Sequence, residues 1–248
     1  MDEGKGKIFA VGIGPGSSDE MTVRAQKVLS ECEVIIGYKS YIDLVICFLE
    51  GKEIISSGMG EEEKRCEQAL KEALSGKRVA IVSSGDPGIY GMAGLVLEIA
   101  ERDGIADKVG IEIVPGVPAF AAAAALVGAP LMNDFAVISL SDLLTPWEKI
   151  EKKLEAAAGW DFVACLYNPK SRKRTHQIER ARELFLKHRD RKTPCAIIRN
   201  ASRPGQIVIM TTLDDLLNHE IDMLCVVIIG NSETRLNGQW MITPRGYR

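Results

Sequence analysis

The chain has 248 residues, a length that fits one large domain or two small ones and that can bury a sizeable core without disulfides or metals. Charged residues make up 26% of the chain, an ordinary share for a globular protein, which argues against wholesale disorder. The formal net charge of −3 argues against a protein that wraps duplex nucleic acid.

The two most apolar stretches predict buried structure rather than a signal peptide or a membrane span. The segment MDEGKGKIFAVGIG begins with acidic residues, and its short apolar run ends in glycines, as in a buried strand. Residues 113–132 lack polar side chains but are rich in alanine and interrupted by prolines and glycines. They predict a strand, a turn and a buried helix, so we expect a cytoplasmic protein that does not enter a membrane.

The first half of the chain alternates strand and helix patterns. Strands are predicted at residues 7–14, 33–37, 52–57, 77–83 and 109–114, and helices at 19–33, 41–49, 61–74 and 90–102. This repeating order predicts a mainly parallel sheet that is covered by helices.

The pattern loosens after residues 128–133. Strands are predicted at 135–140, 162–167, 195–199, 206–211 and 224–229, and helices at 146–158, 175–188 and 213–218. The turn NASRPG makes a hairpin of the strands at 195–199 and 206–211, so the second sheet is expected to be mixed. We therefore predict an α/β protein with an N-terminal domain at 1–128 and a C-terminal domain at 129–248.

Three glycine-rich loops follow strands of the first half, at residues 12–16, 83–91 and 114–119. The first differs from a dinucleotide fingerprint because Pro15 breaks the spacing and removes an N–H donor. In the second, Asp86 suits a cationic ligand or caps the next helix. The third leads into an alanine-rich helix, whose simplest interpretation is tight packing. Each loop alone is also consistent with a plain turn, but together they favour a binding cleft at the carboxyl ends of the strands.

A fourth loop, Tyr167-Asn168-Pro169-Lys170-Ser171-Arg172-Lys173-Arg174, ends a strand of the second half. Its basic cluster suits a polycarboxylate, although a solvated helix start has the same composition. A basic helix N-terminus opposes the helix dipole, which favours a functional role.

Cysteines and histidines give no sign of a metal site. The cysteines at 32, 47, 66, 165, 195 and 225 form no CxxC pair and predict reduced core thiols. The histidines at 176, 188 and 219 are scattered, and no GxSxG elbow occurs.

Four segments resemble the tetrapyrrole methylase family of S-adenosylmethionine-dependent enzymes: GIGPG at 12–16, SSGDPGIYGMAGLVLE at 83–98, VPGVPA at 114–119 and LYNPKSRKR at 166–174. Three segments, GMGEEEKRCEQAL, YNPKSRKR and IIGNSETRLNGQWMITPRGY, are similar to its precorrin-3B C(17)-methyltransferase branch, which includes cobalt-precorrin enzymes. The resemblance implies a homodimer of two-domain chains, S-adenosylmethionine as methyl donor without a metal, and a tetrapyrrole substrate that is methylated at carbon 17 with ring contraction.

The resemblance also implies site residues. Cofactor contacts are expected at Pro15, Ser84, Gly85, Asp86, Tyr90, Pro118, Ala119, Tyr167, Asn168, Ala196, Leu224 and Cys225. Substrate contacts are expected at Gly14, Pro15, Gly16, Met59, Lys170, Arg172 and Lys173, with Arg174 added from the basic cluster. Two positions depart from the family: Pro118 stands where relatives often have a Ser or Thr, and Asn168 where many have a methionine.

Methyl transfer needs positioning of donor and acceptor, and ring contraction needs proton transfers. The candidate acids and bases are Asp86, Tyr90, Tyr167 and His176. The rival hypotheses are an rRNA ribose methyltransferase, a diphthine-type methylase and a non-catalytic tetrapyrrole carrier. The sequence leaves open whether the substrate carries cobalt, and we favour the cobalt form.

Overall fold

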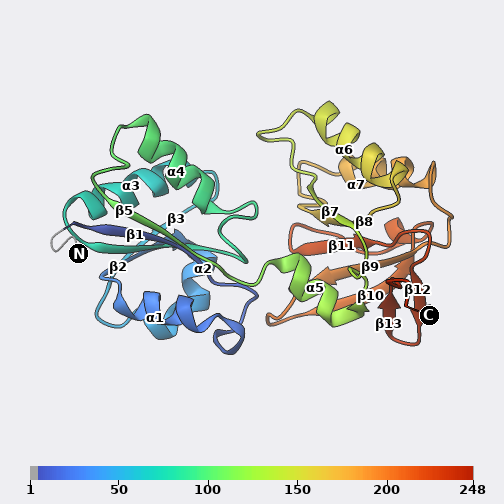
Figure 1. Cartoon of the computed structure of the whole chain (residues 1–248), viewed down its shortest axis with the longest axis horizontal. Helices are drawn as coiled ribbons and strands as arrows, with labels where there is room; N and C mark the ends of the chain where they lie inside the picture. The colour runs from blue at the N-terminus through green and yellow to red at the C-terminus, as the bar shows by residue number, and fades with distance from the viewer. Residues whose placement is uncertain (1–4, 248) are drawn as a thin grey trace. The chain divides into compact units, whose positions relative to one another are not determined.

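The computed structural model describes residues 5–247, and the chain divides into two compact units, Met1–Ala119 and Phe120–Arg248. The first unit is built on a five-stranded sheet in the order β3-β2-β4-β1-β5 (Figure 1), and every strand pair in it is parallel. Its strands are β1 (Lys7–Gly12), β2 (Val34–Tyr38), β3 (Glu53–Ser57), β4 (Arg78–Ser83) and β5 (Gly110–Val114).

Helices cover both faces of this sheet because its central strands are apolar on both sides. On one face, Ile8, Ala10 and Ile81 pack with α3 (Glu62–Leu74) and α4 (Met92–Arg102). On the other face, Phe9, Val11 and Val82 pack with α1 (Val23–Glu31) and α2 (Lys39–Ile42) (Figure 1). Near-continuous apolar strands of this kind are what a buried parallel sheet requires.

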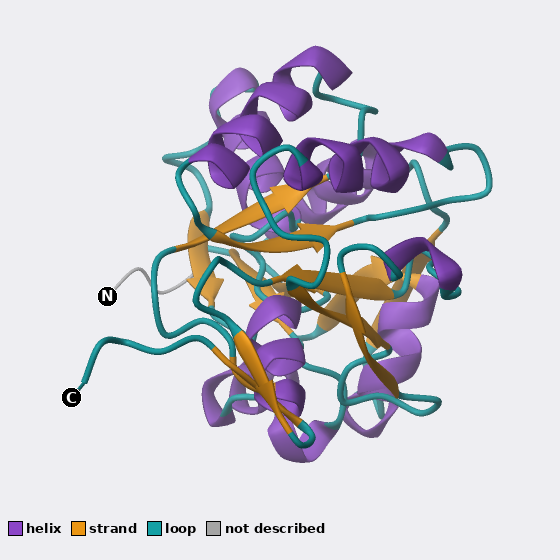
Figure 2. Ribbon diagram, turned by 90° about the vertical axis from the view of Figure 1, so that its right-hand side faces the viewer, coloured by secondary structure: helices purple, strands orange, loops and turns teal. Residues whose placement is uncertain are grey.

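The second unit is built on a mixed sheet in the order β10-β9-β11-β8-β7. Only β7 and β8 run parallel, and β9 and β10 form the predicted hairpin. Its strands are β7 (Phe135–Ser139), β8 (Val163–Tyr167), β9 (Pro194–Arg199), β10 (Ile207–Thr212) and β11 (Cys225–Ile229). Its main helices are α5 (Ala119–Val127), α6 (Trp147–Gly159) and α7 (His176–Leu186); α6 and α7 pack on one face of the sheet. Figure 2 distinguishes the helices, strands and loops by colour. The predicted α/β class, with a parallel and a mixed sheet, is confirmed.

The two units divide at the start of α5, whereas the sequence placed the domain boundary after residue 128. Residues of α5 have partners in the second unit: the Phe120 N–H donates to the Tyr167 hydroxyl, and the Phe120 ring contacts the Phe135 ring. The expected boundary itself stays a prediction.

Two predicted helices take other forms. Residues 41–49 continue α2 as a 3₁₀ helix, η2 (Asp43–Phe48), with a kink at Val45. Of the helix predicted at 213–218, only Leu216–Asn218 is helical. The N–H groups of Leu213 and Asp214 donate instead to the backbone carbonyls of Thr193 and Arg191, outside this segment.

A small three-stranded sheet was not predicted. It joins β6 (Gly128–Ala129), β12 (Arg235–Asn237) and β13 (Trp240–Ile242). Strands this short carry too few residues to show an alternating pattern.

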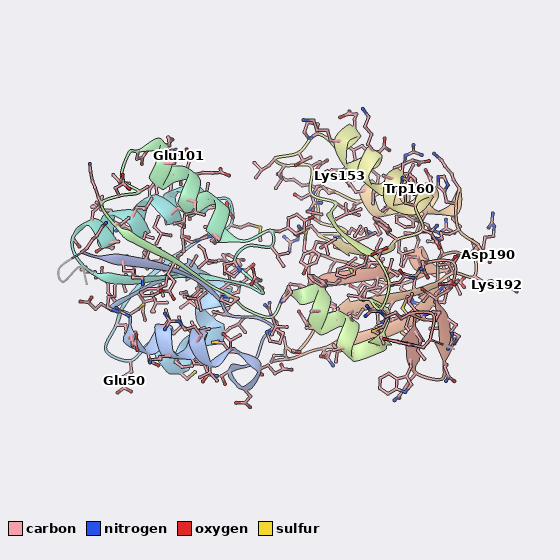
Figure 3. All side chains as sticks on the ribbon, in the orientation of Figure 1. Glu50, Glu101, Lys153, Trp160, Asp190 and Lys192 are labelled. Atoms are coloured by element: carbon pink, nitrogen blue, oxygen red, sulfur yellow. The ribbon has the colours of Figure 1, made fainter. Side chains whose placement is uncertain are left out.

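Charged side chains on the surface point outward, as those of Glu101, Lys153 and Lys192 do in Figure 3. No helix among residues 5–247 is both long enough and apolar enough to cross a membrane.

Five of the cysteine side chains are buried and one, Cys47, is exposed. Burial raises the pKa of the Cys32, Cys66 and Cys165 thiols to about 12 and that of Cys225 to about 11, and it also raises the pKa of Cys195. Thiolate, the reactive form, is therefore suppressed at these buried positions.

We accordingly expect iodoacetamide to modify only Cys47 in the native protein at about pH 8, the range in which an ordinary thiol begins to ionise. Peptide mass spectrometry checks this, with denatured protein as the control in which all six cysteines react. Label on Cys225 in the native protein would contradict the prediction.

Candidate functional site

The loops that follow β1, β4 and β5 meet at the carboxyl edge of the first sheet. These strands are neighbours, so their ends lie side by side. The N–H of Ile13 donates to the Ser83 carbonyl at 2.9 Å, and the N–H of Gly14 donates to the Gly85 carbonyl at 3.0 Å. The first two predicted loops are therefore bound to each other through their backbones.

Glycine is required here because the loop backbones touch. A Cβ on Gly14 would lie 2.1 Å from the Val117 carbonyl oxygen, and a Cβ on Gly116 would lie 2.2 Å from the Gly85 carbonyl oxygen. A Cβ on Gly12 would lie 2.6 Å from the Gly116 nitrogen. In the structure, the missing side chains of these glycines admit the neighbouring loop.

Gly85 is glycine for a different reason. Its φ is +64°, and a Cβ there would meet no atom closer than 3.5 Å. The left-handed backbone, and not crowding, disfavours a side chain at this position. The two nearest groups are the Ala119 nitrogen and the Pro118 Cα, so the structure brings Gly85 together with Pro118 and Ala119.

Asp86 joins the β4 loop to the β5 loop. One carboxylate oxygen accepts the N–H of Gly88 at 2.8 Å, and the other accepts the N–H of Gly116 at 3.1 Å. It does not cap α4, which begins at Met92 after Gly91. Asp86 thus places a half-buried negative charge among the glycine loops, where it can face a cationic ligand.

The remaining predicted residues of the first unit divide into two groups. Pro15 and Gly16 are buried beside Gly14, and the Gly14–Pro15 peptide is cis. Tyr90 is exposed and has a positive φ of 52°. Met59 is exposed in the loop after β3, the strand at the outer edge of the sheet.

Sequence reasoning missed Arg65, which fixes the Met59 loop. Its Nε donates to the Ser57 hydroxyl at 2.8 Å, and its NH2 donates to the Gly58 carbonyl at 2.9 Å. The side chain is buried beside Cys66 and Ala69 in α3. An arginine in the apolar stripe of a helix is a signal that the sequence does contain.

In the second unit, the end of β8 is fixed by polar contacts. The Tyr167 hydroxyl accepts the N–H of Phe120, in the first turn of α5, at 2.8 Å. Asn168 has a left-handed φ of 51°, and its amide donates to the Ser139 hydroxyl at 3.0 Å. Tyr167 and Asn168 are therefore held at the carboxyl edge where β7 and β8 end together.

Arg174 is a structural residue and not part of a solvent-facing basic cluster. It is only 9% exposed, and its NH1 donates to the carbonyls of Leu140 at 3.0 Å and Asn168 at 3.1 Å. Its Nε lies 3.8 Å from Asp142. This corrects the expectation that Arg174 pairs with a substrate, because its guanidinium already binds the ends of β7 and β8. Lys170 is half-buried, and Arg172 and Lys173 are exposed.

The other predicted residues of the second unit lie in different places. His176 is exposed, with its ring 6.1 Å from that of Trp147. Ala196 is fully buried in β9, between β10 and β11. Leu224 is exposed and next to the buried Cys225, in a turn fixed by Asp222. Burial opposes ionisation of Asp222, but the hydrogen bond from Arg199 at 2.9 Å lowers its pKa.

In the described part of the chain, no group of three His, Cys, Asp or Glu side chains is arranged to hold a metal ion. The site in the first unit is the carboxyl edge of the sheet where Gly12, Gly14, Gly85 and Gly116 meet, together with the carboxylate of Asp86. We call it the glycine-built edge.

These features define a class of two-unit α/β proteins. One unit has a parallel sheet with glycine-rich loops, and the other has a mixed sheet. The family model of the tetrapyrrole (corrin/porphyrin) methylases matches residues 7–217, and the chain belongs to this family.

Two curated relatives and one solved structure are similar over nearly the whole chain. The cobalt-factor III methyltransferase of Priestia megaterium is 50% identical over 98% of the chain, which spans 46% of that protein's own length. The probable cobalt-factor III C(17)-methyltransferase of Salmonella typhimurium is 46% identical over 97% of this chain and 99% of its own. The crystal structure of the methyltransferase CobJ superposes with a TM-score of 0.92 at 38% identity, covering 96% of this chain and 100% of that one.

We expect Gly116→Ala to lower the free energy of unfolding by about 1–3 kcal/mol, the usual range for overpacking, because the new methyl meets the Gly85 backbone. Urea denaturation followed by circular dichroism measures the change.

Gly94→Ala is the matched control. A Cβ at this α4 position would meet nothing within 4 Å, so the free energy of unfolding should rise by about 0.5–1 kcal/mol from helix propensity. If Gly116→Ala were as stable as the wild-type protein, the glycine contact would not be the constraint that we describe.

Proposed function

We propose that this chain methylates carbon 17 of cobalt-precorrin-3 or precorrin-3B, with contraction of the macrocycle, and that S-adenosylmethionine is the methyl donor. The observation that carries the proposal is the match to the Salmonella typhimurium protein, which covers nearly the full length of both chains. We further propose a cytoplasmic homodimer, as the family resemblance implies.

The glycine-built edge of the first unit suits the methyl donor, whose sulfonium supplies the electrophilic methyl group when it is bound. Asp86 holds a negative charge in the loop of Gly85, whose nearest neighbours are Pro118 and Ala119. Each carboxylate oxygen accepts one backbone N–H, which leaves acceptor capacity for a cationic centre. Pro15 removes an N–H from the loop where a pyrophosphate would need one, which favours a sulfonium nucleoside over a dinucleotide. Ser84 lies in the same loop and belongs to the proposal.

We assign the other cofactor contacts to Tyr90, Tyr167, Asn168 and Leu224 as groups exposed or half-exposed at loops. Ala196 and Cys225 are buried strand residues, and we assign them to backbone contacts on the adenine side of the cofactor.

Peripheral carboxylates of the tetrapyrrole are assigned to Lys170, Arg172 and Lys173 in the β8 loop. No carboxylate in residues 5–247 forms an ion pair with these three cations. Gly14, Pro15, Gly16 and Met59 are assigned to the macrocycle at the edge of the first sheet.

Ring contraction requires proton transfers, and the chain offers four groups at strand or helix ends. Asp86 and Tyr90 lie in the β4 loop, whereas Tyr167 and His176 lie in the second unit. Asp86 is already engaged with two backbone N–H groups, and the Tyr167 oxygen accepts one. The side chains of Asp86 and Tyr167 are thus held in a defined orientation, which is what an acid or base needs.

The test is incubation with cobalt-factor III or precorrin-3B and methyl-labelled S-adenosylmethionine, followed by mass spectrometry. We expect one added methyl on one of the two macrocycles. Transfer to ribosomal RNA or to a protein acceptor instead would replace the proposal with one of the rival methylases. Tetrapyrrole binding with no affinity for S-adenosylhomocysteine would indicate a carrier.

Lys170→Ala and Arg172→Ala should each raise the KM for the tetrapyrrole about two- to fivefold, the range expected for an exposed ion pair, with kcat retained. Steady-state kinetics at low and high salt measure this, because screening should shrink the difference.

Lys153→Ala and Lys192→Ala provide the control, since each removes an exposed lysine of the second unit that lies outside the β8 loop (Figure 3). An unchanged KM for both loop variants would remove the basic loop from the proposal.

A further inference from the structure

Two adjacent leucines stand exposed in the loop between β7 and α6. Leu143 is 82% exposed and Leu144 is 98% exposed. Figure 1 shows this connection as a loop that reaches out from the sheet and returns to the start of α6. Single exposed apolar residues are normal, and this adjacent pair is the most exposed on the described part of the chain, so we ask what could cover it.

The base of this loop is fixed on both sides. The Leu140 N–H donates to the Tyr167 carbonyl at 2.9 Å, and Arg174 donates to the Leu140 carbonyl at 3.0 Å. The Gln177 amide donates to Asp142 at 3.0 Å. After the tip, the Trp147 ring packs edge-on against the His176 ring. The two leucines therefore project from a held base, and ordering them on a ligand costs less entropy than ordering a loose loop.

The neighbouring loop is cationic. Arg174 binds the carbonyls of Leu140 and Asn168 with the same nitrogen, so the β7 loop and the β8 loop lie against each other. The β8 loop continues into Lys170, Arg172 and Lys173. The one acid at the base of the leucine loop, Asp142, is already occupied by Gln177 and the nearby Arg174. The result is an apolar tip next to a positive loop.

This combination fits a flat, apolar ring that carries carboxylates around its edge. A second protein chain is a poorer match, because a stable interface buries about 800 Å² on each partner and a pair of leucines offers a small part of that. Charge complementarity also favours an anionic ligand at this position.

We propose that Leu143 and Leu144 pack against the face of the tetrapyrrole macrocycle while the adjoining cations bind its carboxylates, an inference that rests on the proposed function. Arg174 and Asp142 act as positioning residues that hold the two loops together. The leucines are binding residues and take no part in the chemical step.

The test compares Leu143→Ser/Leu144→Ser with the wild-type protein by absorbance titration of the tetrapyrrole and by calorimetric titration of S-adenosylhomocysteine. We expect the tetrapyrrole Kd to rise about tenfold, equivalent to about 1.4 kcal/mol, because two apolar side chains no longer cover the ring. The Kd of S-adenosylhomocysteine and the thermal unfolding midpoint should not change, since both leucines are exposed. In turnover, KM should rise and kcat should be retained.

Two further variants sharpen the result. Leu143→Met/Leu144→Met keeps apolar side chains and should keep the wild-type Kd. Leu74→Ser/Leu97→Ser removes two exposed leucines from α3 and α4 and should leave both affinities unchanged.

The outcomes separate this inference from the proposed function. If the wild-type protein methylates the macrocycle and the double serine variant binds it equally well, the leucine inference is overturned alone. If the wild-type protein neither binds nor methylates the macrocycle, the proposed function is overturned, and the leucine inference is overturned with it. A fall in affinity together with a change of mass in analytical ultracentrifugation would assign the leucines to a second copy of the chain and would also overturn the inference.

Discussion

The contact on which the first unit depends is backbone against backbone, where the loops after β1, β4 and β5 touch without side chains between them. Gly12, Gly14 and Gly116 permit that contact, and the positive φ of Gly85 turns the chain into it. Asp86 then closes the arrangement by accepting N–H groups from its own loop and from the β5 loop. Because protein interiors are close-packed and transmit small displacements, the position of the carboxylate is set by the glycines that surround it.

The second unit fixes its strand ends by the opposite means, with buried polar side chains. Arg174 binds the carbonyls that end β7 and β8, and Tyr167 accepts an N–H in the first turn of α5. Such networks hold a loop firmly only when each member is satisfied, and they draw side chains away from ligand binding. This is why the basic run of the β8 loop divides into one structural arginine and three residues available to an anion.

The sequence predicts the parallel unit well because buried strands and amphipathic helices repeat over lengths that a pattern can reveal. It also locates the loops that carry Asp86 and Tyr167, since glycine, proline and polar residues follow each strand. It does not reveal which partner a residue has. Gly116 and Arg174 were placed in the correct loops, but their roles depend on atoms from other strands, and the strands of the C-terminal small sheet are too short to show a period.

A net charge of −3 is compatible with an anionic substrate because several acids already pair with neighbouring cations. Glu112 binds Lys7 and Arg24, Asp214 binds Arg182 and Arg191, and Asp222 binds Arg199. In the part of the chain that the structure describes, Lys170, Arg172 and Lys173 form no such pair. At physiological ionic strength a charge acts over roughly 8 Å, so a ligand at the β8 loop responds to these nearby cations and not to the total for the chain. The sign of the local field, which depends on the charges that are left unpaired, is therefore the reason why we propose this loop as the carboxylate-binding site.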